Sequence, residues 1–135
     1  MNVQEIHEKF SDSPVFRTLG LVVMDVDEHA GGATVRLPIG SAVERVASEG
    51  MVHGGPIATL IDMAGDIAIA VRVGGGVPTI NLRVDYLRPG TGTFLEARAT
   101  VRRLGRTIAT VDIDVFDDQE RLCAIGRGTY SSVVG

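Results

Sequence analysis

The longest apolar stretch of the chain is residues 56–73, where hydrophobic side chains occupy almost every helical position. A helix that is apolar all round is buried in the protein. The glycines at 74–76 follow it, as is usual after the last turn of a helix. This pattern predicts one long buried helix. Residues 3–10 predict a second, short helix that ends at residues 11–14, where Ser, Asp, Ser and Pro follow one another.

Six other segments alternate between hydrophobic and polar residues, which is typical of half-buried antiparallel strands. They are residues 21–28, 33–37, 79–87, 93–102, 107–116 and 121–130. The first two predict a hairpin joined near residues 29–32, and residues 40–52 have the mixed composition of a loop. The order of elements predicts an α+β fold, in which a curved antiparallel sheet of about six strands wraps around one long buried helix. We expect residues 1–135 to form a single domain.

The start of the long helix carries the most informative residues. His53, Gly54, Gly55 and Pro56 open the helix, and one carboxylate, Asp62, follows two turns later. The free N–H groups at a helix start can hold a developing negative charge. A carboxylate on an otherwise apolar helix can attack or deprotonate a substrate. Together these features predict acyl chemistry.

Composition and charge narrow the expected partners and location. The net charge of −4 argues against nucleic-acid binding driven by bulk charge. No apolar run reaches the roughly 18 residues that cross a bilayer, and residues 1–5 lack the pattern of a signal peptide. The single cysteine, Cys123, forms no intrachain disulfide and gives no metal cluster. We therefore expect a cytoplasmic protein with no membrane or nucleic-acid partner and no metal.

The chain resembles the hot-dog-fold acyl-CoA thioesterases of the phenylacetate-degradation and 4-hydroxybenzoyl-CoA thioesterase type. The resemblance covers nearly the whole chain and rests on residues 50–55 (Gly-Met-Val-His-Gly-Gly), on Asp62 nine residues after His53, and on residues 86–89 and 102–106. It implies a hot-dog fold and hydrolysis of a small or medium acyl-CoA or aryl-CoA. It implies no cofactor other than the coenzyme A of the substrate, and a homodimer that commonly pairs into a tetramer.

The resemblance also implies roles for individual residues. Asp62 would act as base or nucleophile, the backbone N–H of Gly54 would bind the oxyanion, and His53 would line the site. Thr79, on the strand after the helix, matches a position that helps bind water or substrate. One position departs from the pattern, because many relatives carry Asn or Gln where this chain has Ala47. Turnover is expected to be lower, unless Ser48 or Glu49 replaces the missing side chain.

Four arginines are candidates for contacts with the phosphates of coenzyme A, since the guanidinium group suits bidentate phosphate binding. They are Arg88, Arg102, Arg103 and Arg106. The alternative for each is a solvated strand surface that pairs with aspartates of the neighbouring strand. The full set of expected substrate-binding residues is Gly55, Thr79, Ser48, Arg88, Arg103 and Arg106.

The spacing of the two central residues predicts a shared site. Gly54 and Asp62 are eight residues apart, which is about 12 Å along a helix and too far to contact one carbonyl group. Two such helices packed antiparallel across a two-fold axis, roughly 8–10 Å apart, would bring Asp62 of one chain near Gly54 of the other. The resemblance implies the same arrangement.

Other interpretations of these residues stay open. Asp62 could belong to a solvent-facing polar stripe with Thr59 and Asp66, and Asp66 itself favours a structural or interface role. His53 could be an ordinary loop histidine, and Tyr86 favours a place in the core over a catalytic role. At the level of function, the alternatives are a non-catalytic acyl-CoA-binding protein and a hot-dog dehydratase. Release of a thiol from a panel of acyl-CoAs distinguishes them from a thioesterase.

Overall fold

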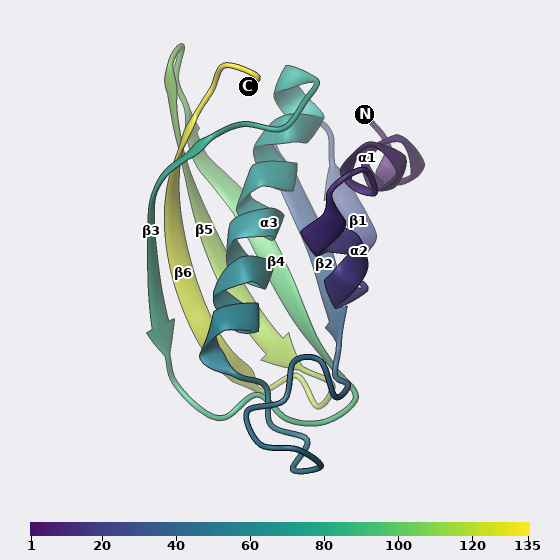
Figure 1. Ribbon diagram of the computed structural model, residues 1–135. Coiled ribbons are helices and arrows are strands. Elements are labelled where there is room, and N and C mark those ends of the chain that lie inside the picture. Colours follow the sequence, from purple (N-terminus) through teal and green to yellow (C-terminus); the bar gives the residue numbers. More distant parts are fainter.

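The computed structural model describes residues 1–135 and contains one six-stranded antiparallel sheet, with the strand order β1-β2-β4-β5-β6-β3. The strands are β1 (Val22–Asp27), β2 (Gly32–Pro38), β3 (Thr79–Tyr86), β4 (Phe94–Leu104), β5 (Ile108–Asp117) and β6 (Leu122–Ser131). All six were predicted from the alternation of residues, and β1 and β2 form the expected hairpin. The sheet curves around the long helix α3, Gly54–Val73 (Figure 1). The predicted α+β architecture is therefore confirmed.

Two short helices, α1 (Val3–Phe10) and α2 (Pro14–Leu19), lie beside β1 (Figure 1). The helix α2 was not predicted from the sequence. It begins with Ser13, whose side chain accepts a hydrogen bond from the N–H of Phe16, and it ends at Gly20, which has a left-handed φ of 66°. Six residues are too few for a helical period to stand out, so only these capping residues mark it.

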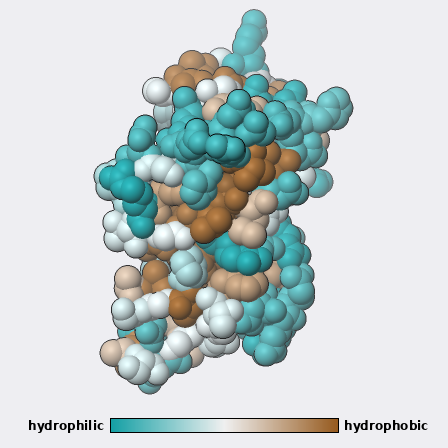
Figure 2. Space-filling model, turned by 90° about the vertical axis from the view of Figure 1, so that its right-hand side faces the viewer, coloured by the Kyte–Doolittle hydropathy of each residue, from teal (hydrophilic) through white to brown (hydrophobic).

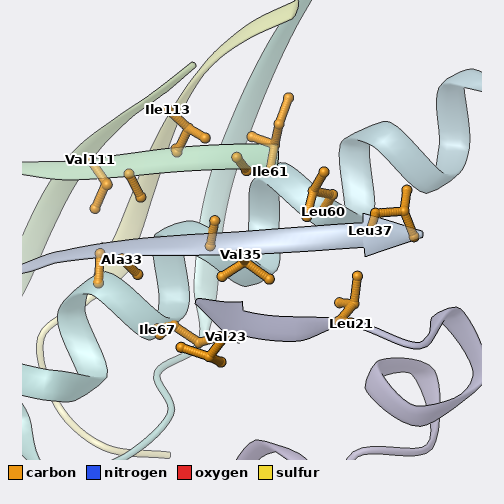
Figure 3. Close-up of a cluster of buried hydrophobic side chains, with 14 of the residues drawn as sticks. Leu21, Val23, Ala33, Val35, Leu37, Leu60, Ile61, Ile67, Val111 and Ile113 are labelled. Carbon is orange, nitrogen blue, oxygen red and sulfur yellow. The ribbon is translucent and has the colours of Figure 1, made fainter. Parts of the chain in front are cut away.

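The core lies between α3 and the sheet. The helix α3 packs on β2, and Figure 3 shows Val35 and Leu37 of β2 in one buried cluster with Leu60 and Ile61 of α3. All four side chains are fully buried, as part of a cluster of 30 buried hydrophobic residues. On β5 the inward side chains, such as Val111, are buried as the alternation predicted. Burial of this apolar surface is the main force that holds α3 against the sheet.

The two edges of the sheet differ in how they are covered. At the β1 edge, the N–H of Val23 donates a hydrogen bond to Nδ1 of His7 from α1, 3.4 Å away. On this side of the molecule hydrophobic atoms are exposed between hydrophilic ones (Figure 2). The opposite edge is β3, which pairs only with β6, and no helix covers its outer edge (Figure 1). Exposed edge strands readily pair with another chain, so β3 is the open edge of this sheet.

The helix α3 is not covered equally on all sides. Ten of its twenty residues are buried by this chain. The residues of one stripe, which includes Thr59, Asp62, Met63 and Asp66, are only half-buried. The apolar pattern predicts burial all round the helix, and this chain buries only part of the helix surface. The carboxylates of Asp62 and Asp66 therefore lie on an accessible face beside β3.

Candidate active site

Asp62 lies on this half-buried stripe in the first half of α3. The hydroxyl of Thr79, the first residue of β3, donates a hydrogen bond to Oδ1 of Asp62 at 2.7 Å. The second oxygen, Oδ2, accepts no hydrogen bond within the chain and can face a water molecule or a substrate. Thr79 and Asp62 are 17 residues apart in sequence, and the expectation that they belong to one site agrees with this contact.

The start of α3 forms the second part of the candidate site. His53 is the N-cap residue, and its Nδ1 accepts a long hydrogen bond of 3.4 Å from the N–H of Gly55. The N–H of Gly54 has no hydrogen-bond partner in the chain. An unpartnered N–H at a helix start is suited to bind an oxyanion, because the peptide dipoles of the helix add to it.

Tyr86 contacts the same helix start, and the prediction that it belongs to the core is wrong. Its side chain is 53% exposed, and its hydroxyl donates a hydrogen bond to the carbonyl oxygen of Gly54 at 2.7 Å. The alternation of β3 ends at this residue, so its ring leaves the core and covers the first turn of α3. A Cβ added at Gly54 would lie 3.3 Å from the ring, so the Tyr86 side chain would have to shift slightly to accept it.

A pocket of about 360 Å³ adjoins Gly54 between the helix start and the end of β3. Ile57, Met51 and Leu87 give it apolar walls, and Arg45 and Arg88 bring two positive charges to it. Neither arginine forms a salt bridge in the chain, so both guanidinium groups are free to bind an anion. The structure thus places Arg88, a candidate for phosphate contacts, in one pocket with Gly54, and adds Arg45, which the sequence did not single out.

The remaining predicted residues lie away from both parts of the site within one chain. Ser48 and Ala47 are in an exposed loop, where Ser48 has a left-handed φ of 67° and its side chain makes no hydrogen bond. Arg103 and Arg106 are exposed at the connection between β4 and β5, at the end of the sheet opposite the start of α3 (Figure 1). A role for these three polar residues in substrate binding stays a prediction.

Asp62 is supported from behind by Tyr130 of β6. The phenol of Tyr130 donates a hydrogen bond of 3.2 Å to the backbone carbonyl of Asp62, and its ring occupies space that Gly65 leaves open on α3. Burial, with the nearby charges of Asp62 and Asp66, raises the pKa of this phenol above its ordinary value. The phenol therefore stays protonated as a hydrogen-bond donor, and it holds the helix backbone at Asp62.

Sequence reasoning missed two contacts that shape the site: the bond from Tyr86 to Gly54, and a bond from the N–H of Val77 to Oδ1 of Asp66 at 2.8 Å. Both join α3 to segments more than ten residues away, so no local pattern reveals them. No group of three or more acidic, His or Cys side chains could hold a metal ion. No helix is long and apolar enough to span a membrane.

The sheet curves around a helix that carries a free N–H at its start and a carboxylate two turns later. This is the arrangement of a hot-dog-fold thioester hydrolase. Residues 49–124 match the family model of the Thioesterase superfamily, and the chain belongs to this family. The predicted family, hot-dog fold and enzyme class are thereby confirmed.

Individual relatives agree with this assignment. A protein of Halobacterium salinarum that carries an esterase name is 35% identical, over 93% of this chain and 88% of that protein. The acyl-coenzyme A thioesterase PaaI of Escherichia coli is 28% identical, over 98% and 91% of the two chains. The solved structure of E. coli PaaI superposes with a TM-score of 0.84, at 26% identity and over 98% and 93% of the chains. A thioesterase structure from Haemophilus influenzae gives a TM-score of 0.85, at 25% identity and over 97% and 90% of the chains.

Proposed function

We propose that this protein hydrolyses the thioester bond of a small or medium acyl-CoA or aryl-CoA, with Asp62 and the N–H of Gly54 as its two reacting groups. The observation that carries the proposal is that each of the two groups has an atom without a hydrogen-bond partner in the structure. Gly54 offers a donor with no partner, and Asp62 offers a carboxylate oxygen with no partner. The relatives named as acyl-CoA thioesterases support the choice of coenzyme A esters. No cofactor is needed, because coenzyme A is part of the substrate.

The chemistry requires a base or nucleophile and an oxyanion donor. As a base, Asp62 takes a proton from water while the water oxygen attacks the thioester carbon. As a nucleophile, the carboxylate attacks that carbon itself and water then cleaves the resulting anhydride. In both routes the carbonyl oxygen becomes negative beside the N–H of Gly54, and the thiolate of coenzyme A leaves. The bond from Thr79 orients Oδ1 of Asp62 and leaves Oδ2 for the reaction.

The two groups must come from different subunits. Along the continuous helix α3, Gly54 and Asp62 are about 12 Å apart, so one chain cannot place both on one carbonyl. The surface beside them supports a homodimer, because β3 is an open edge with Ile80 exposed on it and Leu87 exposed directly after it. We therefore propose two shared sites per dimer. Pairing of dimers into a tetramer and a cytoplasmic location remain part of the proposal.

The pocket beside Gly54 is the proposed place for part of the substrate. Its apolar walls suit an acyl chain or the pantetheine arm, while Arg45 and Arg88 suit the phosphates of coenzyme A. His53 and Gly55 line the same end of α3. The substrate-binding roles of Arg103, Arg106 and Ser48 would require the partner subunit.

The first experiment measures thiol release from short, medium, long and aryl acyl-CoAs. The wild-type protein should release coenzyme A from at least one of them, and Asp62→Asn should abolish this release. Asp85→Asn is the matched control: Asp85 is also a carboxylate, but it lies on β3 and pairs with Arg83, so its loss should leave turnover unchanged. Saturable binding without thiol release would instead identify a non-catalytic acyl-CoA-binding protein.

The shared site is tested by mixing inactive subunits. Gly54→Pro removes the donor N–H and should keep the helix start, because proline is favoured in the first helical turn and His53 already has the extended ψ of 152° that precedes proline. Gly54→Ala adds the same Cβ but keeps the N–H, so it serves as the control. Equal mixing of Asp62→Asn and Gly54→Pro chains should restore about a quarter of wild-type activity, since half of the dimers then carry one intact site. No recovery would refute shared sites.

A further inference from the structure

A second carboxylate, Asp66, lies one helical turn after Asp62 on the accessible stripe of α3. The helix ends at Val73, and Gly74, with a left-handed φ of 90°, turns the chain back toward the sheet. Asp66 binds this returning segment, because its Oδ1 accepts a hydrogen bond from the N–H of Val77 at 2.8 Å. The side chain thus joins the helix to the segment that leads into β3.

This segment places Thr79. Val77 is buried, with 6% of its surface exposed, and lies two residues before Thr79. The hydroxyl of Thr79 then returns to the same helix and binds Oδ1 of Asp62 at 2.7 Å. The two side-chain hydrogen bonds therefore close a ring, which contains two neighbouring turns of α3 and residues 77–79 of the following chain. The bond at Val77 thus ties the segment that carries Thr79 to α3, and the N–H of Ser131 from β6 holds the same segment through the carbonyl oxygen of Pro78 at 2.9 Å.

A charged carboxylate at this place is unfavourable in the folded protein. Burial, with a smaller contribution from the charge of Asp62, raises the pKa of Asp66 to about 6. The other titratable group that faces the pair is the phenol of Tyr130 from β6, and no cation forms a salt bridge with Asp66. The bond from the N–H of Val77 offsets part of this cost, because it favours the charged form.

We propose that Asp66 is a positioning residue for the reaction at Asp62: through Val77 it fixes the start of β3, so that the hydroxyl of Thr79 holds the reacting carboxylate in one orientation. The inference rests on the proposed function of Asp62. Its consequence is that loss of the Asp66 acceptor lowers turnover more than it lowers substrate binding, since Asp66 contacts the carboxylate-holding segment and not the pocket beside Gly54.

Four variants test this role: Asp66→Ala, Asp66→Asn, Thr79→Val, and the double variant Asp66→Ala/Thr79→Val. Removal of the acceptor in Asp66→Ala should lower kcat about tenfold, as expected for one hydrogen bond, with KM nearly unchanged. Asp66→Asn keeps an acceptor oxygen and should retain kcat within severalfold. The double variant should be no slower than Thr79→Val alone, because Asp66 acts through Thr79.

A matched control and a structural readout complete the design. Asp27→Ala removes a carboxylate that holds the N–H groups of His29 and Ala30 in the β1–β2 turn, and it should leave kcat unchanged. Hydrogen exchange at the Val77 amide should accelerate in Asp66→Ala and not in Asp66→Asn. Multiplicative losses in the double variant, or an Asn variant as slow as the Ala variant, would overturn the inference. If Asp62→Asn itself kept full activity, the proposed function would fail instead, whatever the Asp66 variants do.

Discussion

Replacing Asp66 with asparagine should make the protein more stable at neutral and alkaline pH, although it removes a charged group near the active site. The asparagine side chain would keep an acceptor for the N–H of Val77 and lose only the negative charge. That charge is unfavourable in the folded protein, because the carboxylate is partly buried and Asp62 lies one turn away. The unfolded chain, in which both carboxylates are hydrated, has no such cost.

The size of the effect follows from the pKa of Asp66. Folding raises this pKa from 3.8 to about 6. At ~1.4 kcal/mol for each pH unit, this rise of about 2 units corresponds to at most about 3 kcal/mol. Because the side chain is only half-buried, we expect a gain of about 1–3 kcal/mol in the free energy of unfolding.

The sign of the effect also sets its pH dependence. A carboxyl group with a raised pKa favours the folded state below about pH 4, and this contribution is lost as the pH rises through about 6. The advantage of Asp66→Asn should therefore be largest near about pH 8 and vanish near about pH 4.

Urea unfolding at both pH values and one protein concentration measures this difference, since a dimer would make stability depend on concentration. Asp112→Asn is the control with opposite sign, because the pKa of Asp112 is held low by its hydrogen bonds to Arg127. This control variant should lose stability at about pH 8. An Asp66→Asn variant that is equally destabilised at both pH values would refute the reasoning.

Three further predictions concern single contacts. Tyr86→Phe removes the hydrogen bond to the Gly54 carbonyl and should lower the free energy of unfolding in urea by about 0.5–1.5 kcal/mol. An unchanged unfolding midpoint would mean that the bond is not formed in solution. Gly65→Ala would place a Cβ 2.7 Å from Cζ of Tyr130, so thermal unfolding should show a loss of about 1–3 kcal/mol. Ser48→Gly relieves a left-handed φ of 67° and should raise the melting temperature, which a lower value would contradict.

The fold could be predicted from the sequence because its elements have strong and consistent periods. Alternation of residues on the strands reflects one face packed on α3, and each predicted strand was found within a few residues of its place. The elements that the pattern did not predict are those governed by single residues, such as the helix α2, which depends on the caps at Ser13 and Gly20. Such short elements carry no period.

The candidate site could be predicted only in part. The residues at the start of α3 and the spacing to Asp62 form a local motif, so they were visible in the sequence. The bonds from Tyr86 to Gly54 and from Val77 to Asp66 depend on where β3 returns to the helix. Tyr86 was expected in the core because it continues an apolar alternation, and a strand pattern does not show where the strand leaves the core.

Both parts of the site depend on the same strand, and this links catalysis to assembly. At its start β3 holds Asp62 through Thr79, and at its end it holds Gly54 through Tyr86. The same strand is the open edge of the sheet, where the proposed partner subunit would pair. Separation of the subunits would therefore remove the partner's reacting group and also free the strand that orients the remaining one. A variant that weakens the dimer should lose turnover in proportion to the fraction of dimer, whereas variants in the pocket near Arg88 should change KM at any degree of association.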